Sequence, residues 1–157
     1  MSYVGETGEV NATFRPVSGV PRLERPTATA RFVAPGGVTN GQFGLFQWDM
    51  QAKAGGPAAH IHKTFSESFF VLDGTVSLYN GEDWVSATKG DFLYVPEGGI
   101  HAFRNDSDEF ASMLILFAPG APRERFFIEL AEIVDSGKEL SPEEYTAFLA
   151  GHDQYMV

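Results

Sequence analysis

The chain has 157 residues, of which 43% are hydrophobic and 20% are charged, and this length and composition favour a globular domain with a packed core. Its formal net charge of −10 argues against nucleic-acid binding, because an acidic protein repels the phosphate backbone. The absence of cysteine excludes disulfides, thiolate nucleophiles and cysteine-ligated metal sites.

The N-terminal residues 1–25 show no clear hydrophobic period and predict an arm that contributes at most one strand, near Ala12–Arg15. The opening MSYVGETGEV has neither the basic region nor the apolar run of a signal peptide. No apolar stretch in the sequence reaches the roughly 20 residues of a membrane span. These observations lead us to expect a cytoplasmic protein that does not interact with a membrane.

Residues 27–118 contain short strand patterns with turn signals at intervals of about 8–12 residues. The 14 Phe, five Tyr and two Trp suit a β-sheet interior, and Asn80-Gly81 is a strong hairpin signal. We therefore predict an all-β antiparallel sandwich or barrel. The expected strands are Thr27–Val33, Gly41–Met50, Ser68–Leu72, Thr75–Tyr79, Trp84–Ala87, Asp91–Val95, His101–Arg104 and Phe110–Phe117.

The pattern changes in residues 121–151, which predict a tail of two short helices. Apolar residues with helical spacing end at Gly137, a residue that commonly terminates helices. Ser141, Pro142 and Glu144 then form the signature of a capping box at the start of the second helix. Packing against the β domain is the simpler interpretation of the apolar stripes, and a lid over a pocket is the alternative. No repeat divides the chain, so we expect one domain over residues 1–157.

Three of the four histidines lie in two clusters, His60 and His62 with Glu67, and His101 further along. On a strand, residues i and i+2 point to one face with Cα atoms roughly 6.6 Å apart, which allows two imidazoles to reach one ion. The odd spacing from His62 to Glu67 would place the carboxylate on the opposite face of a continuous strand. We therefore predict a bend at Lys63–Ser66 if Glu67 is to join the histidines.

Such a set of three imidazoles and a carboxylate suits one divalent transition metal, with iron, nickel, manganese, cobalt, copper and zinc all possible. Four protein ligands leave one or two positions open for water, oxygen or substrate, which is typical of catalytic rather than structural sites. Taken alone, the histidine pair is a weak signal, and an isolated Glu67 is most often solvated.

Two motifs give the chain a resemblance to the cupin superfamily. The first motif, usually written G-x5-HxH-x3,4-E-x6-G, fits at His60, His62, Glu67 and Gly74, while its leading glycine is displaced by one position to Gly55. The second motif, G-x5-PxG-x2-H-x3-N, is complete, with Gly90, Pro96, Gly98, His101 and Asn105.

The resemblance covers roughly residues 40–118 closely and implies a jelly-roll β-barrel of six to eight strands with the metal in its lumen. We expect the barrel core over about residues 27–118. It also implies a homodimer, and metal ligation by His60, His62, Glu67 and His101. The motif glycines and Asn105 are expected in turns, where they have structural roles. The arm and the helical tail are not specified by the resemblance.

Among cupins, the chain is similar to the quercetinase-like dioxygenases, particularly those of the single-domain bacterial type. That similarity implies a metal that binds a phenolic or enolic oxygen of a small aromatic or apolar substrate, with Glu67 as both ligand and catalytic base. Two other functions remain open. One is non-oxidative chemistry, such as polyketide cyclisation or isomerisation, and the other is small-molecule sensing or binding.

A pocket for a flat apolar substrate needs aromatic walls. Phe69 and Phe103 are in phase with Glu67 and His101 and are expected to face the lumen. For each pocket candidate, a place in the core is the alternative. Further lining candidates, of uncertain phase, are Phe46, Trp48, Tyr94 and Met113.

Four polar residues outside the two motifs are further candidates for substrate contacts. Arg31, Arg104 and Lys63 could anchor an anionic substrate, but we expect them at the surface. His152, in the tail, is expected to be a solvated residue.

Overall fold

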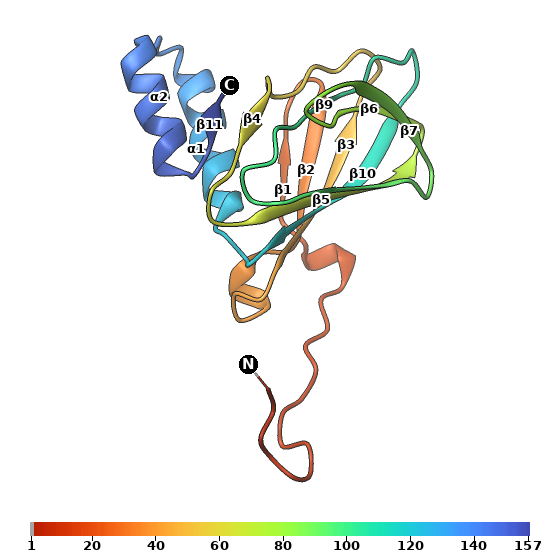
Figure 1. The fold of residues 1–157 in the computed structure, drawn as a ribbon. Coiled ribbons are helices and arrows are strands. Elements are labelled where there is room, and N and C mark those ends of the chain that lie inside the picture. Colours follow the sequence, from red (N-terminus) through yellow and green to blue (C-terminus); the bar gives the residue numbers. More distant parts are fainter. Residues whose placement is uncertain (1) are drawn as a thin grey trace.

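The computed structural model describes residues 2–157, which form eleven strands, two α-helices and two 3-10 helices (Figure 1). The strands are β1 Arg22–Glu24, β2 Ala28–Ala34, β3 Gly44–Met50, β4 His60–Ile61, β5 Ser66–Asp73, β6 Thr75–Tyr79, β7 Trp84–Thr88, β8 Phe92–Val95, β9 Ala102–Arg104, β10 Ala111–Ala118 and β11 Tyr155–Met156. The helices are η1 Val17–Gly19, η2 Gly36–Val38, α1 Arg123–Ser136 and α2 Pro142–Gly151. Every strand predicted between residues 27 and 118 is present, and the predicted ends agree within three residues.

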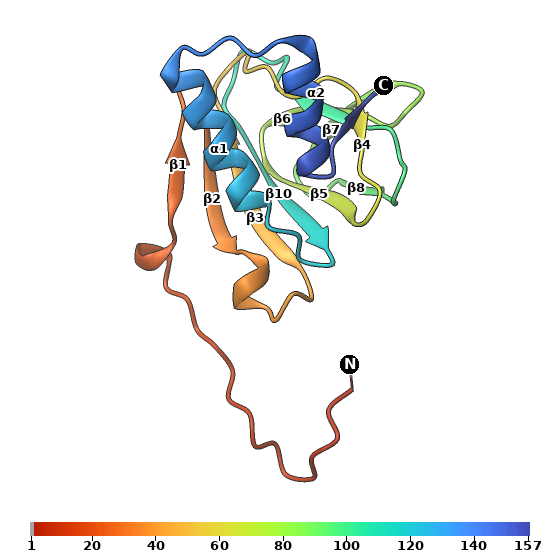
Figure 2. The same ribbon diagram turned by 90° about the vertical axis from the view of Figure 1, so that its left-hand side faces the viewer.

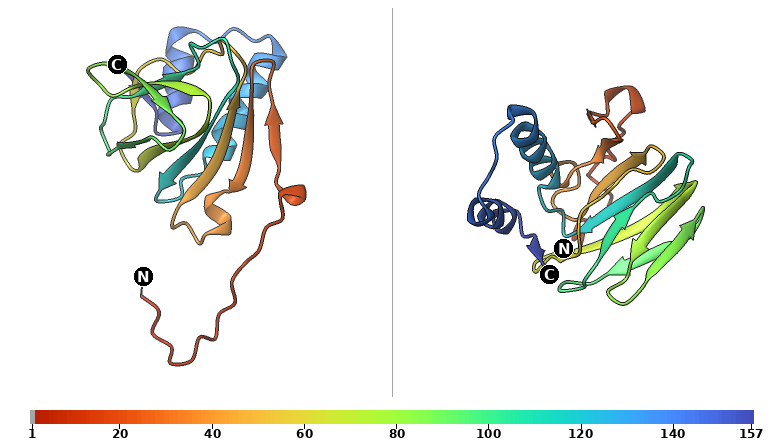
Figure 3. Two further views of the ribbon diagram at one scale, coloured as in Figure 1. Left: turned by 90° about the vertical axis from the view of Figure 1, so that its right-hand side faces the viewer. Right: turned by 90° about the horizontal axis from the view of Figure 1, so that it is seen from above.

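Two antiparallel sheets form the body of the molecule and share one hydrophobic core (Figure 3). The larger sheet has the order β1-β2-β3-β10-β5-β8, and the smaller has the order β7-β6-β9. The predicted jelly-roll architecture is confirmed. The hydrogen-bonded ladders among the described residues do not close into a barrel, however, because β8 pairs only with β5 and β1 only with β2.

The core lies on one face of the larger sheet, as the phase of β5 shows. Glu67, Phe69 and Val71 are buried, whereas Phe70 between them is 41% exposed. Strand β10 pairs with β5 on one side and β3 on the other, so Ile115 stands opposite Phe69 on the buried face. The alternation that was expected after the bend therefore directs Glu67 into the interior.

The N-terminal arm extends away from the body (Figures 1 and 2). The strand predicted near Ala12–Arg15 does not form, because no other strand lies beside this segment, and Arg15 reaches the body only through its side chain, which donates to the carbonyl of Val33 at 2.9 Å. The first strand is β1 instead, which pairs with β2.

The two predicted helices are present, and α1 lies against the buried face of β3 (Figure 2). Phe127 of α1 packs its ring at 5.6 Å from that of Phe46 and 5.0 Å from that of Trp48. Helix α1 ends at Gly137 in the left-handed conformation, with φ of 69°, and α2 begins with the predicted capping box at Ser141. Neither helix in residues 2–157 has the length and apolar character needed to cross a membrane.

After α2 the chain returns to the sheet region and adds a short strand that the sequence did not reveal. In this strand, β11, Tyr155 pairs with Ile61 and Met156 with His60 of β4. The C-terminal residues thereby lie directly beside the first histidine cluster.

Candidate metal centre and adjoining cavity

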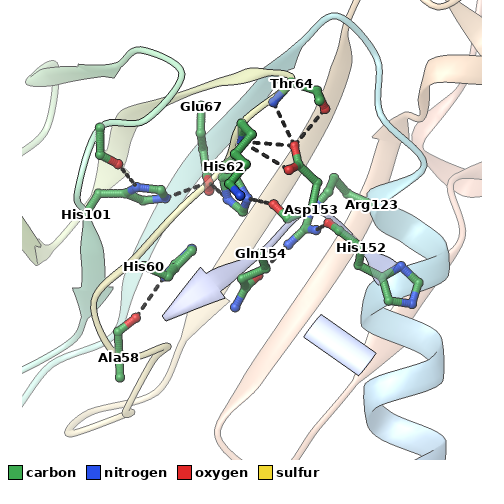
Figure 4. Close-up of polar contacts among 12 residues, drawn as sticks. Ala58, His60, His62, Thr64, Glu67, His101, Arg123, His152, Asp153 and Gln154 are labelled. Carbon is green, nitrogen blue, oxygen red and sulfur yellow. Dashed lines mark hydrogen bonds and ion pairs between the residues drawn. The ribbon is translucent and has the colours of Figure 1, made fainter. Parts of the chain in front are cut away.

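The four residues expected to bind a metal converge in the interior (Figure 4). His60 belongs to β4, His62 follows it, Glu67 belongs to β5, and His101 precedes β9. All four are buried, with exposed fractions of 0–4%, and one potential ligand atom from each lies within 4.8 Å of the others. This cluster could therefore bind a metal ion.

An antiparallel bridge joins the two histidine clusters. The backbone N–H of His60 donates to the carbonyl of His101, and the N–H of His101 donates to the carbonyl of His60, both at 3.1 Å. The pairing places imidazoles from the two motifs side by side, with ring centroids 4.3 Å apart for His60 and His101. Strand β4 ends at Ile61, so His62 lies just beyond the strand on which both histidines were expected.

The predicted bend between His62 and Glu67 is present, and the C-terminal segment stabilises it. The Asp153 carboxylate accepts hydrogen bonds from the backbone N–H groups of Lys63 and Thr64 and from the Thr64 hydroxyl, at 2.7–3.1 Å (Figure 4). These bonds satisfy backbone donors of a segment that has no strand partner. Because the bend ends before β5 begins, Glu67 faces the histidines.

The hydrogen bonds of the imidazoles show how well the cluster suits a cation. The Nδ1 atoms of His60, His62 and His101 each donate to a backbone carbonyl, those of Ala58, Asp153 and Gly99 respectively. In a neutral imidazole the remaining Nε2 then carries the lone pair. The Nε2 atoms of His62 and His101 both lie 2.9 Å from Glu67 Oε2. Two nitrogen lone pairs would then face a carboxylate oxygen, which is unfavourable unless a cation or additional protons lie among these atoms. This donor set fits a divalent transition metal.

The electrostatic environment favours the charge states that metal ligation needs at two of the four residues, Glu67 and His60. Burial would raise the pKa of Glu67, but hydrogen bonds from His101 and His62 lower it well below its ordinary value. Burial, together with the charge of His101, lowers the pKa of His60 to about 4. Burial acts against protonation of His101 too, but the hydrogen bond to Glu67 raises its pKa. Glu67 is therefore ionised and His60 neutral near pH 7.

A cavity of about 460 Å³ adjoins the cluster, between strands of both sheets and the two helices. Its apolar walls come from both sides, and His60 and Glu67 lie at its surface. The sheet side includes Trp48 and Phe103, two of the aromatic residues singled out in the sequence. The helices and the C-terminal segment contribute Arg123, Phe126, Phe127, Leu130, Tyr145, Gln154 and Met156.

The other aromatic and sulfur-containing candidates do not line this cavity. Phe46, Phe69 and Met113 are fully buried in the core, although the Phe69 ring lies 6.0 Å from that of His101. The expectation for Tyr94 is wrong. Because Glu67 pairs with Val95, the neighbouring Tyr94 points to the outer face of the sheet, where it is 56% exposed.

Among the expectations for polar residues outside the motifs, the one for His152 is wrong. Arg31 pairs with Asp49 at 2.9 Å, Arg104 lies over the Trp84 ring, and Lys63 is exposed, so none of these cations lines the cavity. His152, however, is not solvated. Its Nε2 lies 2.7 Å from the Glu129 carboxylate, and its ring packs against aromatic side chains of both helices.

Sequence reasoning missed Arg123 and the C-terminal residues 153–154. Arg123 is the first residue of α1, where the positive end of the helix dipole disfavours a cation. This unfavourable position was the one feature of the sequence that could have indicated a special role for Arg123. Asp153 adopts a left-handed backbone conformation with φ of 55°, which is uncommon outside glycine. Gln154 is 5% exposed and accepts a hydrogen bond from Arg123.

Two comparisons with known sequences agree with the cupin resemblance. A sequence model described as "Cupin domain" matches residues 46–117. The quercetin 2,3-dioxygenase of Bacillus subtilis (strain 168) is 30% identical over 123 residues, which is 75% of this chain and 32% of that protein. The chain thus spans about a third of the length of this relative.

Solved structures share the fold at low sequence identity. KdgF from Halomonas sp. superposes with a TM-score of 0.60 and 14% identity, over 69% of this chain and 94% of that one. The polyketide cyclase RemF from Streptomyces resistomycificus gives a TM-score of 0.58 and 16% identity, over 69% of this chain and 80% of that one. At such low identities the likeness shows a common fold, but it does not indicate which reaction a protein catalyses.

Proposed function

This chain belongs to the cupin superfamily, and we propose that it is a metal-dependent dioxygenase acting on a phenolic, flavonol-like or diketone-type small molecule. The observation that carries the proposal is a buried cluster of three histidines and one glutamate at the wall of an apolar cavity. The similarity to a quercetin 2,3-dioxygenase supports the choice of reaction.

In this proposal His60, His62, Glu67 and His101 hold one divalent transition metal. When bound, such an ion supplies the positive charge that stabilises a substrate oxyanion and, if redox-active, the electron transfer that a reaction with oxygen needs. The protein contributes a fixed set of ligands, because the backbone carbonyls that accept from each Nδ1 orient the imidazoles.

Glu67 is the proposed proton acceptor. Its carboxylate is ionised near pH 7 and lies at the cavity wall, where a substrate hydroxyl can approach it. Removal of the hydroxyl proton produces an electron-rich phenolate or enolate, the form that reacts with oxygen. The second role, as a ligand, keeps the carboxylate beside the site where the charge develops.

The remaining cavity walls explain the proposed substrate class. Trp48 and Phe103 from the two sheets and Phe126 and Phe127 from α1 all line the cavity, so a flat molecule would contact aromatic surfaces. These side chains also keep water from the reacting centre. A cavity of about 460 Å³ is large enough for a molecule of two or three rings.

The decisive test measures metal content and oxygen uptake together. Protein purified without added metal is analysed for its elements, then loaded separately with iron, nickel, manganese and cobalt, and supplied with a flavonol or a β-diketone. We expect oxygen consumption in step with substrate loss for at least one metal. Turnover without oxygen consumption would instead favour cyclisation or isomerisation, and tight binding without turnover would favour a sensor.

Substitution of Glu67 tests its role within the same assay. Glu67→Gln should keep the metal, because the amide oxygen still ligates, but should lose about 100-fold or more in oxygen uptake, since the proton acceptor is gone. The matched control is Glu82→Gln, which alters an exposed carboxylate in a hairpin turn and should leave activity unchanged. Full activity in Glu67→Gln would remove the residue from the catalytic role.

A further inference from the structure

Arg123 is the cationic side chain that the structure buries inside the cavity. It is 4% exposed and shares the cavity wall with His60 and Glu67. Its Cζ atom lies 4.2 Å from the centre of the Phe126 ring. Three more phenyl rings lie 5.5–5.6 Å away, those of Phe65, Phe117 and Phe127. The guanidinium thus lies in an aromatic cage at the polar end of the cavity.

No carboxylate neutralises this charge directly. Within residues 2–157, no Asp or Glu oxygen lies within 4.0 Å of the Arg123 guanidinium, whereas Arg25, Arg31, Arg104 and Arg125 each contact a carboxylate. Burial lowers the pKa of Arg123 to about 10, so the group is still protonated near pH 7. Burying a cation with no carboxylate in contact is costly, and the charges of Glu67 and Asp153 stabilise Arg123 only from beyond 4.0 Å.

The hydrogen bonds of Arg123 leave part of the guanidinium available. Nη1 donates to the carbonyl of His152 and Nη2 donates to Gln154 Oε1, both at 2.9 Å (Figure 4). Both acceptors are neutral. The Nε–H is buried and has no hydrogen-bond partner among the described residues. The orientation of the planar group is therefore fixed, while one donor has no partner.

We infer that Arg123 determines substrate specificity by anchoring an anionic oxygen, so that the cavity selects flat apolar molecules that carry a carboxylate or an ionised enol. This inference rests on the proposed function in that it names the substrate class of the same cavity. An anion beside Arg123 would compensate for the burial of its charge, while the aromatic walls bind the apolar body.

A purely structural role for Arg123 makes a different prediction. Its two Nη hydrogen bonds join the start of α1 to the C-terminal segment, and an arginine kept only for that purpose would not distinguish a charged ligand from a neutral one. Discrimination between a carboxylate and its amide therefore separates the two roles. Cinnamate and cinnamamide form a suitable pair, because both are flat, have the same size and differ in charge.

The experiment measures the dissociation constants of cinnamate and cinnamamide by ligand-detected NMR or calorimetry, with protein that is metal-loaded and protein treated with a chelator. We expect cinnamate to bind about tenfold more tightly than cinnamamide in both forms. Arg123→Met should bring the ratio close to one. The matched control is Arg125→Met, which removes the same charge from an exposed position on the same helix and should preserve the ratio.

Several results would overturn the inference. They are equal binding of the two ligands to the unmodified protein, no binding of cinnamate at millimolar concentration, and an unchanged ratio in Arg123→Met. If Arg123→Met does not fold, Arg123→Lys decides. One ammonium group cannot keep both Nη hydrogen bonds and also contact a ligand anion, so its ratio should fall clearly below that of the unmodified protein. An unchanged ratio in Arg123→Lys counts against Arg123.

The same data separate this inference from the proposed function. A preference for cinnamate that disappears when the metal is removed but survives in Arg123→Met would assign the carboxylate to the metal and refute the role of Arg123. A preference that persists without metal, in a protein that consumes no oxygen with any substrate, would support Arg123 and refute the dioxygenase proposal.

Discussion

His62 and His101 contact the same oxygen of Glu67 at the same distance of 2.9 Å, yet different parts of the chain hold them. The Nδ1 of His101 donates to the carbonyl of Gly99, two residues earlier in the same motif. The Nδ1 of His62 donates to the carbonyl of Asp153, which lies 91 residues later. One half of the cluster is therefore supported within its own motif, whereas the other half depends on the C-terminal segment.

The largest expected effect comes from removing a ligand of the less locally supported half. His62→Ala should lose most of the bound metal, because the remaining two imidazoles and one carboxylate form an incomplete set. Elemental analysis of protein purified without added metal provides the measurement. His152→Ala is the control, since this fourth histidine contacts Glu129 outside the cluster and its loss should not change metal content. An unchanged metal content in His62→Ala would refute the coordination proposal.

The next prediction tests the C-terminal support itself. Asp153→Ala removes the carboxylate that fixes the bend at Lys63 and Thr64, so His62 loses its fixed position. Changes of this kind around metal ligands commonly reduce metal affinity by about 10- to 100-fold, and we expect a loss in that range. Competition with a chromophoric chelator measures it.

Asp153→Asn is the matched variant for that measurement. Asparagine tolerates the left-handed backbone at this position, where φ is 55°, and retains one acceptor oxygen for the bend. It should therefore lose less affinity than Asp153→Ala. If both variants bind metal as tightly as the unmodified protein, the C-terminal segment does not support His62.

The locally supported half offers a contrasting substitution. Asn105 is 1% exposed, and its side-chain amide donates to the carbonyls of Gln51 and Glu109 and accepts from Ser107. Asn105→Ala removes the hydrogen bonds that its amide makes to Gln51, Glu109 and Ser107, and should lower the free energy of unfolding by about 2 kcal/mol, measured by urea denaturation. The metal affinity of the folded protein should fall less than in Asp153→Ala. If Asn105→Ala lowers the metal affinity more than Asp153→Ala does, the proposed difference between the two halves of the cluster is wrong.

The same contrast explains how much the sequence could predict. The strands between residues 66 and 118, the bend before Glu67 and the capping box follow from patterns within short segments and were predicted. The four clustered residues were implied by the resemblance to the two cupin motifs. Tyr94 was misplaced because its side depends on the pairing of Glu67 with Val95, a register between strands that no single segment encodes. Asp153 was missed for a similar reason, because β11 has only two residues and carries no detectable period.

Arg123 and the cavity mark a second limit of the sequence. The helices were expected to pack on the β domain, and they do, but which of their side chains face the interior depends on where α1 lies across β3. The positions of Phe46 and Met113 in the core rather than at the cavity follow from that same packing. Side-chain alternation predicts which face of a strand is buried. It does not predict which of the buried side chains pack in the core and which line a cavity.

The smallest expected effect tests whether α2 and the C-terminal segment act as one unit. Ser141→Ala removes the capping box of α2 and should cost about 1 kcal/mol of stability, measured by urea denaturation, with Ser141→Asn as a control that retains a good N-cap. Metal affinity should not change, because Arg123 and the bend at Thr64 hold the residues that follow α2 independently of its first turn. A parallel loss of metal affinity would show that the helix, rather than these contacts, positions Asp153.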